Sequence, residues 1–290
     1  MADWELLYHQ AIGTDFTKTV HRDVYPAISP SRPELNQSGK VVLVTGGGTN
    51  IGLAIAQAFV KASADTVIII GRRADVLATA SSSLEQVAKE VNVKTRITAR
   101  TCDITNLAEL DVLWKDLSTQ GITVDVLVPN AAKFTEAKPI LELGADEVWS
   151  QFDFIVNVAT QAIHMSAHPV IAVRPAYTLT KMAGALLFQV IAQNTPPQKM
   201  QVVSFHPGLI LTEGWKVLNP PPDLLFDNPE LCGSFAVWAA TKEAEFLHGR
   251  FVWASWDVGE LAMGEIRKRI DEDPYYLRAS VVGLNGALKA

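Results

Sequence analysis

The sequence has few cysteines, no long hydrophobic run and no excess of basic residues, and each shortage excludes a class of protein. Its 2 cysteines, Cys102 and Cys232, lie far apart without metal-ligand neighbours, which predicts free thiols in a reducing compartment. No apolar run is long enough to span a bilayer, and the acidic start MADWELLYHQ lacks the basic residues of a signal peptide. A formal net charge of −6, without a run of Lys and Arg, argues against a nucleic-acid partner. We therefore expect a cytoplasmic protein that binds neither membranes nor nucleic acid and holds no metal.

The remaining composition is that of a globular α/β protein. With 290 residues, of which 48% are hydrophobic and 19% charged, the chain can bury a large core as one α/β domain of generous size or as two small ones. Residues 1–39 include the proline-rich stretch YPAISPSRPEL and are expected to form an extended arm over that domain, with a disordered tail as the alternative. Residues 40–265 are expected to form the domain itself, and residues 266–290 a C-terminal helical tail.

The segment Val41–Gly52, VVLVTGGGTNIG, has the pattern of a strand, a tight turn and a helix. β-Branched residues precede three consecutive glycines, and an apolar pattern of helical period follows them. Glycines let the backbone approach an anion closely, and the first turn of the next helix presents unpaired N–H groups and the positive end of its dipole. The segment therefore predicts a phosphate site for a nucleotide.

Strands and helices alternate along the first half of the chain. The expected strands are Val41–Thr45, Thr66–Ile70, Lys94–Thr101 and Val124–Pro129, and the expected helices are Ile51–Lys61, Ala74–Glu90 and Leu107–Gln120. This order indicates a doubly wound parallel sheet, Rossmann-like, with helices on both faces. Ligands of such sheets bind beyond the carboxyl ends of the strands, so polar residues at those ends are candidate site residues.

Three strand ends carry polar residues that suit a dinucleotide. Arg72 and Arg73 follow the second strand, where an NAD site has an acidic residue and a 2′-phosphate favours arginine. Asp103 follows the third strand, where it can accept the adenine amine, and Asn130 follows the fourth. Each can also be an ordinary turn residue. Together with the glycine turn, the arginine pair favours NADP(H) over NAD(H).

Tyr177 and Lys181 lie four residues apart in the helical pattern AYTLTKMAGALLFQVIAQ, so both side chains project from one face. A phenol with its ordinary pKa near 10 is a poor acid at neutral pH, and an adjacent ammonium lowers that pKa towards the working range. Reduction of a ketone needs such a proton donor at the developing alkoxide. An amphipathic helix with one surface lysine and one interfacial tyrosine is the alternative interpretation.

These segments together resemble the short-chain dehydrogenase/reductase family over about residues 40 to 265. In chain order, the resemblance rests on Thr45–Gly52, Asp103–Ile104, Asn130–Ala132, Tyr177-x-x-x-Lys181 and Pro207–Thr212. The late segment GRFVWASWDVGEL is similar to filamentous-fungal reductases that accompany secondary-metabolite pathways.

The resemblance implies a role for each matching position. Tyr177 would be the general acid/base, Lys181 would lower its pKa and bind the nicotinamide ribose, and Asn157 would relay protons. The backbone of Ile210 and the hydroxyl of Thr212 would contact the nicotinamide amide. The expected cofactor-binding residues are Gly46, Thr49, Asn50, Ile51, Gly52, Arg72, Arg73, Asp103, Asn130, Tyr177, Lys181, Ile210 and Thr212.

The turn departs from the family pattern at one position. Asn50 stands where the family has the middle glycine of the phosphate-binding turn. Asparagine tolerates left-handed backbone but adds side-chain bulk near the pyrophosphate. Cofactor binding is therefore expected to survive the change.

The segment before Tyr177 is shorter than the family pattern. Nineteen residues separate Asn157 from Tyr177, where the family has a long helix, the fifth strand and a catalytic serine. A parallel crossover needs about a dozen residues or more, with a helix of about 11–12 residues on average and a strand of about 5–6, so nineteen residues cannot hold the family's long helix together with the strand and the loops that join them. Ile163–Ala167 resembles the end of the fifth strand, which makes Ser166 the candidate for orienting the carbonyl. The alternative is a continuous helix from near Asp146 to Ser166.

The sequence thus predicts an NADP(H)-dependent oxidoreductase that interconverts a small-molecule ketone and a secondary alcohol by hydride transfer, in secondary-metabolite biosynthesis. Its fold would be a single domain with an abbreviated crossover from the fourth to the fifth strand. The alternative is a catalytically impaired NADP(H)-binding protein of the same fold. The resemblance also implies a homo-oligomer, weakened by the shortened helix.

Overall fold

The structure, a computed structural model, describes residues 16–131, 157–164, 169–172, 175–212, 215 and 220–280. The strands are β1 Val41–Thr45, β2 Thr66–Gly71, β3 Arg96–Thr101, β4 Val126–Val128, β5 Ser204–His206 and β6 Phe251–Trp253. The α-helices are α2 Asn50–Lys61, α3 Ala74–Glu90, α4 Leu107–Thr119, α7 Pro169–Ala172, α8 Pro175–Gln193, α10 Pro229–Ala239, α11 Val258–Leu261 and α12 Gly264–Glu272. The 3₁₀ helices are η1 Pro26–Ile28, η2 Pro33–Leu35, η3 Gln161–Ile163 and η4 Lys242–Leu247.

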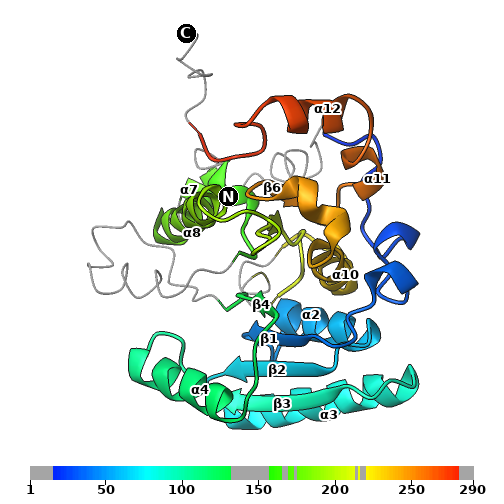
Figure 1. Cartoon of the computed structure of the whole chain (residues 1–290). Helices are drawn as coiled ribbons and strands as arrows, with labels where there is room; N and C mark the ends of the chain where they lie inside the picture. Colours follow the sequence, from blue (N-terminus) through cyan, green and yellow to red (C-terminus); the bar gives the residue numbers. More distant parts are fainter. Residues whose placement is uncertain are drawn as a thin grey trace.

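The strands form a parallel sheet of order β3-β2-β1-β4 and a second parallel pair, β5-β6. In register, Val42 of β1 pairs with Val67 of β2 on one side and with Val126 of β4 on the other. The strand order therefore changes direction at β1, with β2 and β3 on one side and β4 on the other (Figure 1). This confirms the doubly wound sheet and places the glycine turn after β1 at the topological switch point, where such sheets bind ligands.

The central strands β1 and β2 are buried on both faces of the sheet. Val42 and Val44 of β1 pack in a large apolar cluster with residues of α2, α3 and α10. Leu43, between them, packs on the opposite face in a second cluster with Leu113 and Leu117 of α4. A strand covered by helices on both faces needs a continuous apolar run, which explains the run of β-branched residues in β1 and β2.

The expected elements of the first half agree with those observed. Strand Val41–Thr45 and helix Ala74–Glu90 have the expected bounds, and the ends of the other elements differ from those expected by at most two residues. The first half therefore follows from local patterns of hydrophobicity.

Residues before the sheet pack against it. Ile28 of η1 and Leu35 of η2 are fully buried in the large apolar cluster. The backbone N–H of Gln37 donates to the carbonyl of Ala62 at 2.8 Å, directly after α2. Ile270 of α12 joins the same cluster from the other end of the domain.

The segment Asn157–Thr160 lies between the two sheets. Val158 forms a parallel bridge with Phe205 of β5, and the Ala159 N–H donates to the Phe205 carbonyl at 2.8 Å. On the other side, the Val158 N–H donates to the carbonyl of Pro129, after β4, at 3.5 Å. This segment therefore takes the sheet position between β4 and β5, and residues 132–156 before it lie outside the described residues.

Both interpretations of the segment before Tyr177 are wrong for the residues that the structure describes. Of the strand end expected at Ile163–Ala167, the described residues Ile163 and His164 are not in a strand, because Gln161–Ile163 forms the 3₁₀ helix η3 and the sheet position is already filled. A continuous helix from Asp146 is excluded as well, since Thr160 has extended backbone with φ −151 and ψ 150. Ser166 lies outside the described residues.

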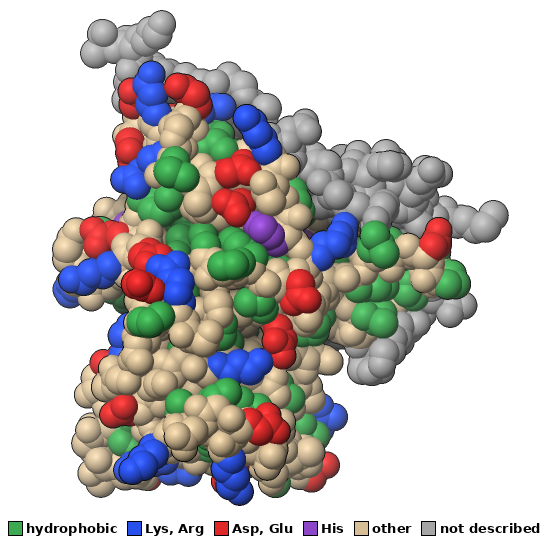
Figure 2. Space-filling model, turned by 90° about the vertical axis from the view of Figure 1, so that its right-hand side faces the viewer, with side chains coloured by type: hydrophobic (Ala, Val, Ile, Leu, Met, Phe, Trp, Pro, Cys, Tyr) green, Lys and Arg blue, Asp and Glu red, His purple; other side chains and the backbone are tan. Residues whose placement is uncertain are grey.

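The surface that the structure describes carries charges of both signs. Basic and acidic side chains are interspersed over the face shown in Figure 2. Within the described ranges, no helix has the length and apolar character needed to cross a membrane.

The close approach of α10 to α2 gives a first prediction. A Cβ atom added at Gly233 would lie 2.5 Å from the Ala54 carbonyl oxygen, whereas one at Gly184 of α8 would meet nothing within 4 Å. Gly233→Ala should lower the free energy of unfolding by about 2 to 3 kcal/mol through overpacking. Gly184→Ala should raise it by about 0.5 to 1 kcal/mol through helix propensity. Urea unfolding of both variants tests this, and equal effects would contradict the packing.

Candidate active site

The turn after β1 leaves no space for side chains. Gly46 has φ +62, and a Cβ atom at Gly52 would lie 2.2 Å from the Gly46 carbonyl oxygen. Asn50, the first residue of α2, has φ +45, in the left-handed region that asparagine tolerates. Thr49, the N-cap residue of α2, makes no side-chain capping bond. The first N–H groups of α2 therefore lie at a turn that has no side-chain cap from Thr49 and no room for a side chain at Gly52, an arrangement that suits a pyrophosphate.

Asn130 joins the ends of β1 and β4. Its backbone N–H donates to the Thr45 hydroxyl at 2.8 Å, and its side-chain amide donates to the Thr45 carbonyl at 3.0 Å. The Ala131 N–H donates to the same hydroxyl at 2.9 Å. Asn130 thus fixes the floor of the glycine turn. The Thr45 hydroxyl accepts both N–H groups, a role that the sequence motif did not indicate although it includes Thr45.

The expected adenosine-binding residues follow the next two strands. Arg72 and Arg73 come directly after β2 and are both exposed, with Arg73 as the N-cap residue of α3. Asp103 follows β3, where its carboxylate accepts the Thr105 N–H at 3.0 Å and the Thr105 hydroxyl at 2.8 Å. All three follow the carboxyl ends of parallel strands, on the same edge of the sheet as the glycine turn.

Lys181 reaches from α8 to the segment between the sheets. Its ammonium Nζ donates to the carbonyl oxygen of Val158 at 3.0 Å. Burial lowers the pKa of Lys181 from 10.5 to about 8. Tyr177, one turn earlier on α8, is partly buried. The backbone of Val158 therefore determines where the ammonium lies, and sequence analysis missed this because a main-chain carbonyl leaves no residue-specific signal.

Asn157 is bound to β5. Its side-chain amide donates to the Ser204 hydroxyl, and its backbone carbonyl accepts the Phe205 N–H at 3.4 Å. Thr160, at the end of the same segment, is buried, and its hydroxyl accepts the Ala162 N–H at 3.4 Å as the N-cap of η3. The segment Asn157–Thr160 takes the position of the fifth strand, and Thr160 places a hydroxyl at its end. Sequence reasoning did not identify Thr160 as a candidate site residue.

His206, the last residue of β5, is a buried neutral side chain. Burial, and to a smaller extent the neighbouring His164, lowers the pKa of His206 to about 3. Its ring packs edge-on against Trp253 with centroids 4.6 Å apart. The loop that contains Ile210 and Thr212 begins directly after it, with Ile210 buried and the Thr212 N–H donating to the Ile210 carbonyl at 2.8 Å.

The residues present fit a dinucleotide cofactor. The turn from Gly46 to Gly52 is closed to side chains, as the clash distance at Gly52 shows. Basic, acidic and amide side chains follow β2, β3 and β4 in turn, and Lys181 lies beside the next sheet position. Such a site can hold phosphates at one end and a proton donor with its ammonium neighbour at the other.

Comparison with known proteins gives consistent matches. The family model described as short chain dehydrogenase matches residues 40–168. A short chain dehydrogenase/reductase of Aspergillus aculeatus, AacuD, is 30% identical over 286 residues, covering 92% of this chain and 96% of that protein. A short chain dehydrogenase/reductase of Claviceps purpurea is 30% identical over 285 residues, covering 92% and 94%.

Solved structures share the fold. The L-sorbose reductase of Gluconobacter frateurii, solved with NADPH and L-sorbose, matches with a TM-score of 0.63 and 23% identity, over 80% of this chain and 100% of that chain. The Pseudomonas aeruginosa RhlG/NADP complex matches with a TM-score of 0.61 and 20% identity, over 77% and 97%.

The burial of Lys181 predicts a pH-dependent stability. Because its pKa falls from 10.5 to about 8 on folding, the unfolded chain binds more protons between these values, and stability rises with pH there. The unmodified protein should therefore gain about 3 kcal/mol relative to Lys181→Met between pH 7 and pH 10.5. Lys181→Met also removes the hydrogen bond to the Val158 carbonyl. Because both the ammonium and the neutral amine can donate this bond, its loss should change the free energy of unfolding by a similar amount at every pH.

Urea unfolding at several pH values measures this difference. Lys199→Met, at an exposed lysine, controls for general removal of a charge. If the difference in the free energy of unfolding between the unmodified protein and Lys181→Met stays constant with pH, the lowered pKa of Lys181 is contradicted.

Proposed function

Because the chain belongs to the short-chain dehydrogenase/reductase family, we propose that it uses NADP(H) to interconvert a small-molecule ketone and a secondary alcohol. The observation that carries the proposal is the ammonium of Lys181, bound to the Val158 carbonyl one helical turn from Tyr177. An ammonium one helical turn from a phenol would lower the pKa of that phenol, which is what a tyrosine acid requires at neutral pH.

The proposed cofactor site runs along the carboxyl edge of the sheet. The turn from Gly46 to Gly52 would hold the pyrophosphate, with Thr49, Asn50 and Ile51 in the same turn. Asp103 would receive the adenine amine and Asn130 would support the floor of the turn. Support for NADP(H) comes from Arg72 and Arg73, two exposed guanidinium groups that suit a 2′-phosphate.

In the proposed reduction, the cofactor supplies a hydride to the carbonyl carbon. Tyr177 donates its phenol proton to the carbonyl oxygen as negative charge develops there. Lys181 stabilises the phenolate that remains and binds the nicotinamide ribose, while Ile210 and Thr212 contact the nicotinamide amide. Water then returns a proton to Tyr177, and the relay role proposed for Asn157 lies on this route. Ser166 stays the proposed carbonyl-orienting residue, outside the described part of the chain.

The proposal also covers the location, the assembly and the pathway of the protein. Unpaired, buried Cys102 and Cys232 are consistent with a cytoplasmic location. Exposed Leu179, Met182, Leu186 and Val190 recur at helical spacing on α8, which supports a homo-oligomer in which a second chain covers this face. Resemblance to filamentous-fungal reductases supports a place in secondary-metabolite biosynthesis.

A second candidate function is NADP(H) binding without efficient turnover. It is favoured by the small number of hydrogen bonds between β4 and the segment Asn157–Thr160. Strand β4 has three residues, and the Val158 N–H donates to the Pro129 carbonyl at 3.5 Å. The nucleotide turn follows β1 and is held by Asn130, which forms hydrogen bonds with Thr45 and not with Val158. NADPH binding in the absence of any reduction across a ketone panel would favour this candidate.

The proton donor is tested by Tyr177→Phe. Removing the phenol hydroxyl should lower the rate of NADPH-dependent ketone reduction by about 10²- to 10⁴-fold. The Kd for NADPH should change by less than about threefold, because the hydroxyl acts mainly in the transition state. Tyr275→Phe, at an exposed tyrosine, is the matched control. Undiminished turnover by Tyr177→Phe would assign the proton transfer to another group.

The choice of cofactor is tested by Arg72→Ala. The unmodified protein should bind NADPH at least about tenfold more tightly than NADH, about 1.4 kcal/mol. Arg72→Ala should remove most of that preference by weakening NADPH binding alone. Arg96→Ala, at the opposite end of β3, should leave it intact. Equal affinities of the unmodified protein for NADPH and NADH would overturn the assignment.

A further inference from the structure

The loop Pro207–Thr212 is held by a carboxylate from the segment before α10. Asp227 Oδ2 accepts the Leu209 N–H at 2.6 Å, and the Leu209 carbonyl accepts the Asp227 N–H at 2.7 Å. Gly208 has φ +99, and a Cβ atom there would lie 2.7 Å from Asp227 Oδ2. The conformation of the loop therefore depends on a glycine at residue 208 and on the side chain of Asp227.

Asp227 is itself buried and faces Arg22. Its side chain is 9% exposed, and its Oδ1 lies 3.2 Å from Arg22 Nη1. Burial raises the pKa of Asp227, and the Leu209 N–H and Arg22 oppose this effect. Arg22 also donates to the Leu225 carbonyl at 3.2 Å and accepts the Asn228 N–H at 2.9 Å through its own carbonyl. A buried carboxylate that loses its ion-pair partner is strongly destabilised, so Arg22 maintains the bond to Leu209.

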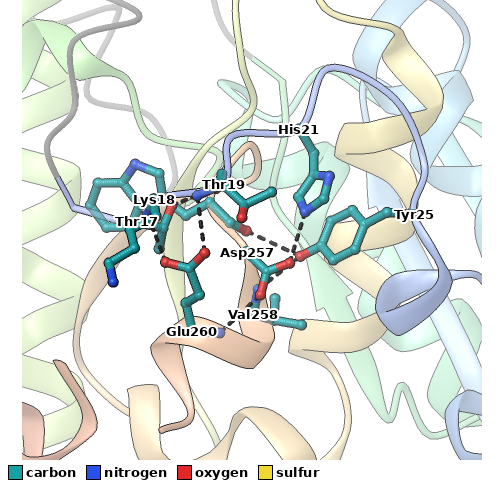
Figure 3. Close-up of polar contacts among 9 residues, drawn as sticks. Thr17, Lys18, Thr19, His21, Tyr25, Asp257, Val258 and Glu260 are labelled. Atoms are coloured by element: carbon teal, nitrogen blue, oxygen red, sulfur yellow. Dashed lines mark hydrogen bonds and ion pairs between the residues drawn. The ribbon is translucent and has the colours of Figure 1, made fainter. Parts of the chain in front are cut away.

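The N-terminal segment that carries Arg22 is fixed independently of the loop. Glu260 of α11 accepts the backbone N–H groups of Lys18 and Thr19 at 2.6 and 3.0 Å (Figure 3). His21 Nε2 lies 2.8 Å from Asp257 Oδ2 (Figure 3). The Tyr25 hydroxyl donates to the Trp256 carbonyl at 3.1 Å and accepts the Val258 N–H at 2.9 Å. These bonds to the residues around α11 set the position of Arg22 from outside the cofactor site.

We propose that Arg22 and Asp227 are positioning residues that hold Pro207–Thr212 in the conformation needed by the nicotinamide half of NADP(H). The inference rests on the proposed function, because the contacts of Ile210 and Thr212 with the nicotinamide amide are part of it. It extends the cofactor site to residues before the first strand, since Arg22 lies 19 residues before Val41. The adenosine half of the cofactor lies against other segments and does not depend on this pair.

The experiment compares Arg22→Gln, Arg22→Lys and Asp227→Asn with the matched control Glu230→Gln. Glu230 lies three residues after Asp227 and pairs with Lys61 at 3.1 Å, without contacting the loop. Two quantities are measured: hydrogen exchange at the Leu209 amide without cofactor, and the Kd values of NADPH and of 2′,5′-ADP, which lacks the nicotinamide half.

Arg22→Gln and Asp227→Asn should speed exchange at the Leu209 amide by about tenfold. They should raise the Kd of NADPH by about fivefold and leave that of 2′,5′-ADP unchanged. Arg22→Lys, which keeps the positive charge, should largely restore the normal exchange rate and the normal Kd of NADPH. Glu230→Gln should change neither quantity.

Three results would overturn the proposal. Unchanged exchange in Arg22→Gln would mean that the ion pair does not hold the loop. If Arg22→Gln and Asp227→Asn weaken the binding of NADPH and of 2′,5′-ADP equally, the pair supports the structure in general and does not position the loop. If the unmodified protein binds neither ligand, the proposed function itself fails, and the role of the pair towards NADP(H) fails with it.

Discussion

The segment Asn157–Thr160 is the constraint on which the second half of the structure depends. Within four residues it donates one N–H towards Pro129 and another to Phe205, and it offers the Val158 carbonyl to Lys181. Backbone groups buried between two sheets must find partners, and here each partner belongs to a different element. The relative positions of β4, β5 and α8 are therefore linked through the main chain of two residues.

This link has consequences for the charge of Lys181. An ammonium in a buried position is stabilised only by the dipoles that face it, and the carbonyl of Val158 is the acceptor that the described contacts supply. One neutral acceptor does not compensate for lost hydration, so the pKa falls to about 8. Lys181 is therefore mainly an ammonium at neutral pH and loses its charge at mildly alkaline pH.

The first half of the fold could be predicted from the sequence because its signals are local. Val41–Thr45 and Ala74–Glu90 have bounds set by hydrophobic period and by turn residues, and β1, β2 and β3 are consecutive in the chain and pair with each other in that order. The glycine turn could be predicted for the same reason, since Gly46 and Gly52 contact each other across six residues. Arg72, Asp103 and Asn130 follow from the same strand ends.

The second half could not be predicted in this way because its contacts join distant segments. Val158 pairs with Phe205, and nothing in the local pattern of FIVNVATQAI distinguishes that pairing from a helix start. Ile163 is apolar enough to end a strand, but the sheet position was already occupied, so it became part of η3. Arg22 and Asp227 meet across 205 residues, and a single charge in each segment carries no signal of the partner.

The two halves of the proposed cofactor site therefore differ in how they are stabilised. The phosphate turn is enclosed by β1, α2 and Asn130, and α2 buries Ile55, Phe59 and Val60 in the main core. The nicotinamide end depends on Lys181 and on the loop at Ile210, which are held by contacts with Val158 and Asp227. The helix that carries Lys181, α8, buries only Ala176, Thr178, Ala185 and Ala192. Fewer buried apolar contacts make local opening easier, so it should affect the nicotinamide end before the phosphate turn. Binding of the adenosine half and reduction of a carbonyl are therefore separable properties of this fold, and a change that weakens one can leave the other intact.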